Sequence, residues 1–168
     1  IKITVMRLSF FIIFCISQVY SFAQTKTDEK AAIEYFINKY PNGQKEAEGK
    51  YINGKEHDKW MYWHSNGQLK QIAHFNVGRL HGNVIYYYPN GDKKDEGFFV
   101  AGKQHGNYTS WYSNKNVKLQ GKYTKDNKSG HWISYYENGN KEWEGNYKNN
   151  QKDYGMYLMY LLFLNKKN

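Results

Sequence analysis

The chain has 168 residues, a formal net charge of +9 and a single cysteine, Cys15. One cysteine excludes an intramolecular disulfide, and Cys15 lies in a segment that we expect to be removed on export, so the mature protein also lacks a thiol nucleophile. The excess of lysine and arginine favours contact with anionic polymers or lipid headgroups, or keeps a tyrosine-rich protein soluble.

Residues 1–23 have the layout of a secretory signal peptide. Two basic residues, Lys2 and Arg7, precede the apolar residues 8–16, and a Ser-Phe-Ala cleavage site ends at residue 23. The apolar core is too short to span a bilayer, and the signal-peptide interpretation also holds if translation starts at Met6. We therefore expect an exported protein, whether periplasmic, attached to the cell envelope or secreted.

The segment 24–38 forms an N-terminal cap for which two structures are open. Residues 28–37 fit a short helix with three apolar side chains on one side. Equally, Tyr35 to Tyr40 fit an aromatic strand, because Tyr40 is in phase with the aromatic residues of the segments that follow.

A turn signal recurs every 24 residues through residues 39–156. The pairs are Asn42-Gly43, Asn66-Gly67, Asn90-Gly91 and Asn138-Gly139, with Asn114-Lys115 in the same phase. A strict period of this length is typical of repeat proteins, in which each unit packs on its neighbours. Because Asn-Gly accommodates positive φ at both positions, we expect a two-residue type I′ hairpin turn at each pair.

Short runs rich in Tyr, Trp, Phe and Ile lie between these turns and favour β-strands. Each repeat then consists of two antiparallel strands, and five repeats give ten strands in a row of about 48 Å. The predicted fold is all-β: an elongated single-layer antiparallel β-meander built from five 24-residue hairpin repeats. Residues 157–168 begin almost wholly apolar, and we interpret them as an edge strand or tail that closes the sheet or awaits a partner.

Large aromatic residues are the best candidates for binding. Strand alternation places Trp60 and Tyr62 on one face and Met61 and Trp63 on the other, so both faces have aromatic side chains. Such rings either pack against each other to hold the sheet or contact a partner. The candidate binding residues are Trp60, Trp63, Tyr87, Trp111, Trp132, Tyr135 and Trp143.

Metal and catalytic sites find no support in the pattern. His57, His81 and His105 share a phase, but equivalent residues one repeat apart lie two strands apart, at about 9–10 Å. Three such residues cannot bind one ion through bonds of about 2.0–2.1 Å. No nucleophile elbow, H-E-x-x-H or glycine-rich phosphate loop occurs. We therefore expect no metal, no cofactor and no catalytic residue.

The segments 78–82 and 102–106, with the sequences G-R-L-H-G and G-K-Q-H-G, resemble the G-x-x-H-G centre of MORN repeats. Over residues 39–156 the chain resembles the MORN-variant repeats of bacterial proteins described as YwqK-like antitoxins. It departs from them at Asn114-Lys115, at Asp58 and after Tyr154. The resemblance implies a non-catalytic antiparallel β array that contacts proteins or lipids.

These observations lead to one expected function and two alternatives. The first is an exported, non-catalytic module that binds an envelope or extracellular protein through its aromatic ladders. The alternatives are electrostatic adhesion to anionic lipid or cell-wall polymer, and antitoxin-type inhibition of a periplasmic toxin. Export disfavours nucleic acid as a partner, and the apolar C-terminal edge is compatible with a homodimer.

Overall fold

The computed structural model of the chain describes residues 31–153. The predicted signal peptide, residues 24–30 of the cap segment and the apolar segment 157–168 lie outside these residues and remain predictions.

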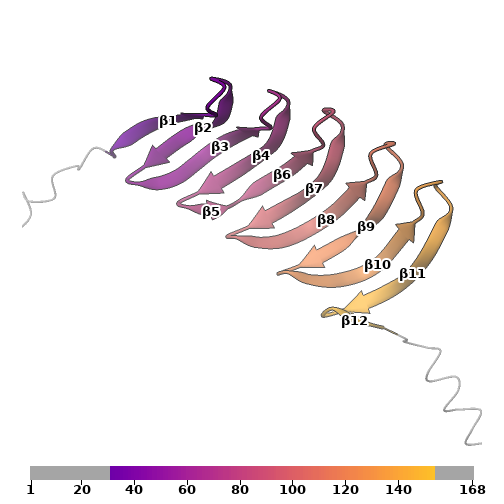
Figure 1. The fold of residues 1–168 in the computed structure, drawn as a ribbon. Helices are drawn as coiled ribbons and strands as arrows, with labels where there is room; N and C mark the ends of the chain where they lie inside the picture. Colours follow the sequence, from indigo (N-terminus) through magenta and orange to yellow (C-terminus); the bar gives the residue numbers. More distant parts are fainter. Residues whose placement is uncertain (1–30, 154–168) are drawn as a thin grey trace, which may run out of the picture. The chain divides into compact units, whose positions relative to one another are not determined.

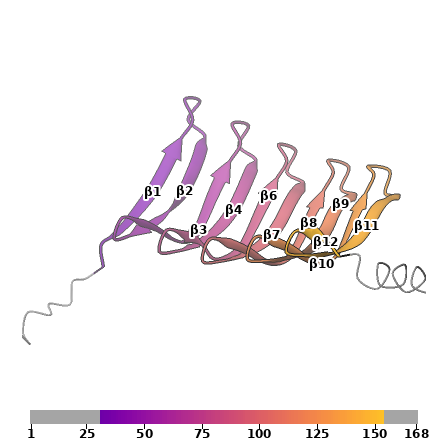
Figure 2. The ribbon, with the colours of Figure 1, turned by 90° about the horizontal axis from the view of Figure 1, so that it is seen from below.

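The described part of the chain forms one antiparallel sheet whose strands lie side by side in sequence order (Figures 1 and 2). Ten strands have six to nine residues, and two have only two residues. The ten longer strands are β1 (Ile33–Lys39), β2 (Lys45–Ile52), β3 (Lys55–Trp63), β4 (Leu69–Asn76), β6 (Gly82–Tyr87), β7 (Lys93–Val100), β8 (Lys103–Trp111), β9 (Val117–Thr124), β10 (Asn127–Tyr135) and β11 (Lys141–Lys148). The short strands β5 (Arg79–Leu80) and β12 (Gln151–Lys152) pair with β4 and β11. The predicted all-β single-layer meander is confirmed.

The N-terminal alternative is also decided for its described residues. Ile33–Lys39 form β1, which pairs antiparallel with β2. The strand interpretation is therefore confirmed, and the helix interpretation of 28–37 is wrong over the part of this segment that the structure describes.

The Asn-Gly turns differ from the expected type. The Gly43 N–H donates to the Tyr40 carbonyl at 2.9 Å, and φ is positive at Gly43 (83°) but not at Asn42. This is a type I turn followed by a left-handed residue, which makes a three-residue loop with a bulge. The prediction of type I′ turns at these pairs is wrong. Proline fits this geometry because its fixed φ suits the first central position of a type I turn, which Pro41 occupies.

Type I′ turns connect the strands at their other ends, away from the Asn-Gly turns. Each has two consecutive residues with positive φ: Asn53-Gly54, Val77-Gly78, Ala101-Gly102, Lys125-Asp126 and Asn149-Asn150. Asn and Gly tolerate this conformation, whereas a β-branched residue is strained in it. Val77, with φ of 50° and 55% exposure, is therefore the most strained of these turn residues.

Hydrogen bonds between equivalent loops hold successive repeats in phase. The Tyr40 hydroxyl donates to the Trp63 carbonyl at 2.8 Å, and the Tyr88 hydroxyl donates to the Trp111 carbonyl at 2.8 Å. The Asn42 side-chain amide likewise donates to the Ser65 carbonyl of the next loop. These bonds give the turn period a structural role beyond reversing the chain.

Tryptophan rings on one side of the sheet lie directly over glycines of the neighbouring strand. A Cβ added to Gly49 would lie 2.2 Å from the Trp60 ring, and one added to Gly121 would lie 2.1 Å from the Trp132 ring. Trp60 is 2% exposed and Trp132 is 0% exposed. Only glycine leaves room for an indole at these positions, so ring and glycine form one packing unit.

Further rings surround each of these tryptophans. The Tyr51 ring lies edge-on to Trp60 at 4.9 Å, and the Tyr123 ring lies edge-on to Trp132 at 4.9 Å. We call this side the packed face. It is defined by Trp60, Trp132 and the ring column Tyr51, Phe75, Phe99, Tyr123 and Tyr147. It contains the core of the sheet.

Candidate functional site

The opposite side of the sheet, the open face, has no core of its own. Its centre row runs across ten strands because each member pairs in register with the next. The centre row consists of Ile37, Glu48, Met61, Ile72, Ile85, Glu96, Thr109, Gln120, Ile133 and Glu144. No side chain of the centre row is fully buried, so this face is available for contact along its length.

Charges on the open face are paired in every second repeat. The Lys45 amine lies 2.6 Å from the Glu48 carboxylate, and the equivalent pair Lys93–Glu96 has a separation of 2.8 Å. The third pair, Lys141–Glu144, has a separation of 2.9 Å. Hydrogen bonding to Lys141 lowers the pKa of the Glu144 carboxyl, and hydrogen bonding to Glu96 raises the pKa of Lys93. Each of the three carboxylates of the centre row therefore already has a lysine as its ion-pair partner.

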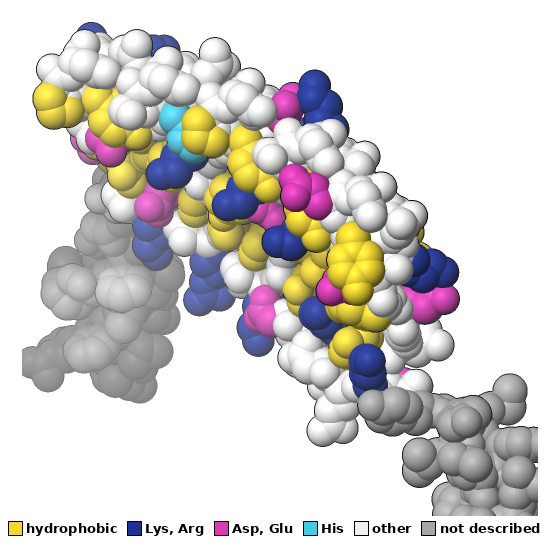
Figure 3. All heavy atoms as spheres, turned by 45° about the vertical axis from the view of Figure 1, so that its right-hand side comes forward, with side chains coloured by type: hydrophobic (Ala, Val, Ile, Leu, Met, Phe, Trp, Pro, Cys, Tyr) yellow, Lys and Arg dark blue, Asp and Glu magenta, His cyan; other side chains and the backbone are white. Residues whose placement is uncertain are grey.

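Uncharged pairs replace these ion pairs in the intervening repeats, and in the second of these repeats the pair is Val117 and Gln120. Leu69 lies at the position of Lys45, and Ile72 lies at the position of Glu48. Where the lysine is absent its acidic partner is absent too, which avoids an unpaired carboxylate on a partly apolar surface. Figure 3 shows the resulting mixture of hydrophobic, basic and acidic side chains on one side of the array.

Four half-buried aromatic rings, one per repeat, flank the centre row on the side of the Asn-Gly turns. This aromatic column consists of Trp63, Tyr87, Trp111 and Tyr135. Lys45 lies over the Trp63 ring at 5.3 Å, and Lys93 lies over the Trp111 ring at 5.7 Å. The rings are held in place while part of their surface stays accessible.

The seven predicted binding residues thus divide between the two faces. The aromatic column brings four of them together on the open face. Trp60 and Trp132 are buried in the packed face, so they serve the core and leave the candidate set. Trp143 is also on the packed face, where it contacts Tyr147 with ring centroids 6.1 Å apart. Alternation along each strand predicts this division, but it does not predict which face contains the buried core.

A second flank of the open face, on the side of the type I′ turns, is polar and basic. This flank row consists of five register pairs, Tyr35–Lys50, Lys59–His74, Asn83–Phe98, Asn107–Lys122 and His131–Asn146, and the register shifts or is interrupted between one pair and the next. It contains three lysines, two histidines and no acidic residue. None of its members is among the predicted binding residues, although the 24-residue alignment brings them into two common phases when it is extended to the non-aromatic positions.

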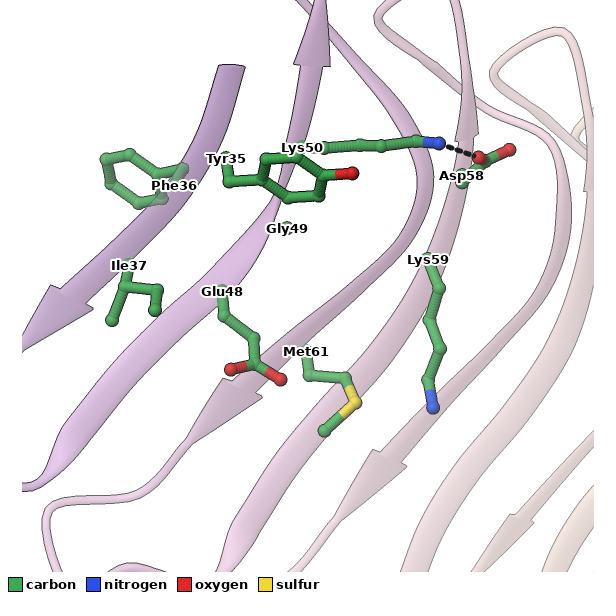
Figure 4. A pocket seen from close by; sticks show the side chains of 9 residues that line it. All are labelled: Tyr35, Phe36, Ile37, Glu48, Gly49, Lys50, Asp58, Lys59 and Met61. Atoms are coloured by element: carbon green, nitrogen blue, oxygen red, sulfur yellow. Dashed lines mark ion pairs between the residues drawn. The ribbon is translucent and has the colours of Figure 1, made fainter. Parts of the chain in front are cut away.

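Three hollows recur between the centre row and the flank row. The largest, of about 460 Å³, lies over β1, β2 and β3 and is lined by Tyr35, Ile37 and Met61 together with charged residues (Figure 4). The others, of about 340 and 320 Å³, involve equivalent positions two or more repeats further along. The recurrence follows from the period, because each repeat presents the same small and large positions.

In the largest hollow, one cation has an anionic partner and another has none. The Lys50 amine lies 2.5 Å from the Asp58 carboxylate (Figure 4). Hydrogen bonding between them raises the pKa of Lys50 and lowers that of Asp58. Lys59 is exposed and makes no ion pair with any described residue. Tyr35, which is the register partner of Lys50, is 80% exposed.

The histidines of the glycine-bounded loops contact the backbone. His57 Nδ1 faces the N–H of Val77, and His81 Nδ1 faces the N–H of Ala101, each at 3.5 Å. Within residues 31–153, no group of three His, Cys, Asp or Glu side chains is placed to hold a metal ion. Over the same residues no helix is long and apolar enough to cross a membrane.

Comparison with known proteins identifies the repeat. The family described as MORN repeat variant matches residues 59–76, 80–101, 104–125 and 128–149, together half of the chain. A comparison with curated proteins gives no match. One similar solved structure is a chain of the crystal structure of the GtfA/B complex bound to UDP and GlcNAc, with 12% identity and a TM-score of 0.27. That match covers 87% of this chain and 28% of the other. The four matched segments are successive hairpins of the sheet, and the chain belongs to the MORN repeat variant family.

Proposed function

We propose that the chain is an exported, non-catalytic repeat module that binds a protein partner on its open face. The observation that supports this most strongly is the aromatic column Trp63, Tyr87, Trp111 and Tyr135. Its rings are half-buried, equally spaced and outside the core. Tyrosine and tryptophan are enriched at protein interfaces because each buries a large rigid surface at a low entropic cost.

A pull-down with matched variants tests the proposal. The wild type is immobilised and exposed to an extract of the source cells at about 0.15 M ionic strength. The variant W63A/W111A removes two rings of the aromatic column, and Y136A/W143A removes two rings elsewhere. We expect a captured protein to be lost with the first variant and retained with the second. Capture of no protein, or equal loss with both variants, contradicts the proposal.

Export is tested separately by N-terminal sequencing. A mature protein that begins at Gln24 supports a signal peptide over residues 1–23. A mature protein that retains the segment contradicts it.

Electrostatic adhesion to an anionic lipid or cell-wall polymer is the second candidate, favoured by the formal net charge of +7 over residues 24–168, which have 22 Lys and Arg against 15 Asp and Glu. Such binding falls steeply with ionic strength, whereas docking of apolar surface on aromatic rings changes little. A salt series on the captured complex therefore separates the two. Inhibition of an exported toxin is a finer version of protein binding, and it predicts that the captured partner is a toxin.

A further inference from the structure

The flank row of the open face offers hydrogen-bonding groups that the fold does not use. Asn83 on β6 and Asn107 on β8 are exposed, and their side-chain amides make no hydrogen bond within residues 31–153. They occupy equivalent positions one repeat apart. A side-chain amide has both donors and an acceptor, so it can bond to the N–H and C=O of a peptide unit.

The flank row also has basic side chains and no acidic side chain of its own. Its acidic neighbours are already occupied, because Glu48, Glu96 and Glu144 pair with lysines on the far side of the centre row and Asp58 pairs with Lys50. Lys59 and Lys122 remain without an ion-pair partner among the described residues. An acidic ligand along this row therefore gains two new ion pairs without displacing an existing one.

The spacing of these groups selects the conformation of the ligand. Two strands, and hence one repeat, advance about 9.6 Å along the sheet. Three residues of extended or polyproline II peptide advance about 9.3–9.9 Å. Lys59 on β3 and Lys122 on β9 are five strands apart, about 24 Å or about seven extended residues, with the two asparagines between them.

We propose that the open face binds an extended acidic peptide segment of its partner, at three residues per repeat, with Asn83 and Asn107 on the peptide backbone and Lys59 and Lys122 on carboxylates. This inference rests on the proposed function, since it names the class of the protein partner. The aromatic column and the flank row then contact the two sides of one peptide.

Poly-L-glutamate, which is extended at neutral pH, is the probe. Its binding to the full chain is measured by fluorescence anisotropy at about 0.15 M ionic strength. The variant K59Q/K122Q is expected to weaken binding about tenfold, the loss of two exposed ion pairs. The control K55Q/K103Q removes the same charge from the first residues of β3 and β8, next to the type I′ turns. We expect this control to weaken binding less than about twofold.

The variant N83A/N107A separates peptide recognition from general attraction, because it leaves the charge unchanged. We expect it to weaken binding about fivefold, which corresponds to two lost hydrogen bonds. Unchanged affinity in this variant, or equal weakening in the two lysine variants, contradicts the proposal. Thermal melts of each variant show that the fold is retained.

Polygalacturonate provides the competing class of ligand. Binding of this acidic glycan without binding of poly-L-glutamate overturns the peptide proposal in favour of a polysaccharide. No binding of either polymer also overturns it, and the pull-down with W63A/W111A still decides the proposed function independently. Binding of poly-L-glutamate that depends on both the lysines and the asparagines supports the proposal.

Discussion

The two faces of the sheet follow the same 24-residue period but fill it differently. On the packed face, size complementarity decides which residues are present, since Trp60 lies over Gly49 and Trp132 over Gly121. On the open face, charge and hydrogen-bonding capacity decide, since lysine and glutamate occur together or are absent together. One repeat sequence therefore encodes stability on one side and an accessible surface on the other.

The middle of the packed face has a different pair at the positions where tryptophan lies over glycine in other repeats. Val84 occupies the tryptophan position and is 1% exposed, and the glycine position before it is Ala73, which is 0% exposed. A smaller side chain on one strand thus accompanies a larger one on its neighbour. The pair is therefore buried on the packed face even without tryptophan and glycine.

The largest expected effect is the difference in the free energy of unfolding between two variants, each lacking one tryptophan of one face. Trp132→Ala removes a fully buried ring and is expected to lower the free energy of unfolding by about 3–5 kcal/mol. Trp111→Ala removes a half-buried ring from the open face and is expected to cost about 1–2 kcal/mol. Urea unfolding of the two variants measures the difference. Equal losses would mean that the open face contributes to the core as much as the packed face does.

A smaller effect tests the ring-over-glycine packing directly. Gly121→Ala places a methyl group 2.1 Å from the Trp132 ring, and the resulting displacement is expected to cost about 2–3 kcal/mol. Gly145→Ala is the matched control, because its nearest described neighbour is the Lys152 side chain at 3.8 Å. We expect that control to change stability by less than about 0.5 kcal/mol. A tolerated alanine at 121 would contradict the packing described for this face.

The turns belong to neither face and allow stability to be changed without altering the open face. Val77→Asn replaces a β-branched residue at φ of 50° with one that tolerates this conformation, as Asn53 does in the equivalent turn. We expect an increase in the free energy of unfolding of about 1 kcal/mol, measured by thermal denaturation. The control Val100→Asn, in the adjoining repeat but within β7, is expected to give no increase. A destabilised V77N protein would show that the valine has a packing role.

The smallest effect concerns alkaline pH and again involves the packed face. Burial, reinforced by the hydrogen bond of its hydroxyl to the Asp95 carboxylate at 2.7 Å, raises the pKa of Tyr108 above its ordinary value near 10. The fold therefore prefers the neutral phenol, and this contribution is complete below pH of about 10 and is lost as pH rises above it. We expect the melting temperature to fall between about pH 10 and 11. Tyr108→Phe should flatten that fall, and an unchanged slope in this variant would assign it to other groups.

The sequence predicts the strands, their order and their phase, because the period is strict and the hydrophobic pattern repeats with it. It also predicts that Trp60 and Trp63 lie on different faces. It does not predict which face holds the core, since both are aromatic and the deciding feature is the glycine opposite each tryptophan on the neighbouring strand. The type of the Asn-Gly turns is not predicted for a similar reason: Pro41 and the bulge at Gly43 fix a type I turn, whereas the dipeptide alone favours type I′.

The flank row could be aligned from the sequence but not interpreted as a site. Lys59 and Lys122 resemble any other lysine until the ion pairs of their neighbours are known, and Asn83 resembles a loop residue until its strand is placed. Their significance arises from what surrounds them in the sheet.

Hydroxyl-radical footprinting of the wild-type chain tests the division between the two faces most directly. Side-chain oxidation rates are measured by mass spectrometry for four tryptophans in one sample, without any substitution. We predict rapid oxidation of Trp63 and Trp111 and strong protection of Trp60 and Trp132, in line with their exposure. Equal rates for all four, or protection of Trp63 and Trp111 in place of Trp60 and Trp132, would contradict the assignment of a packed and an open face.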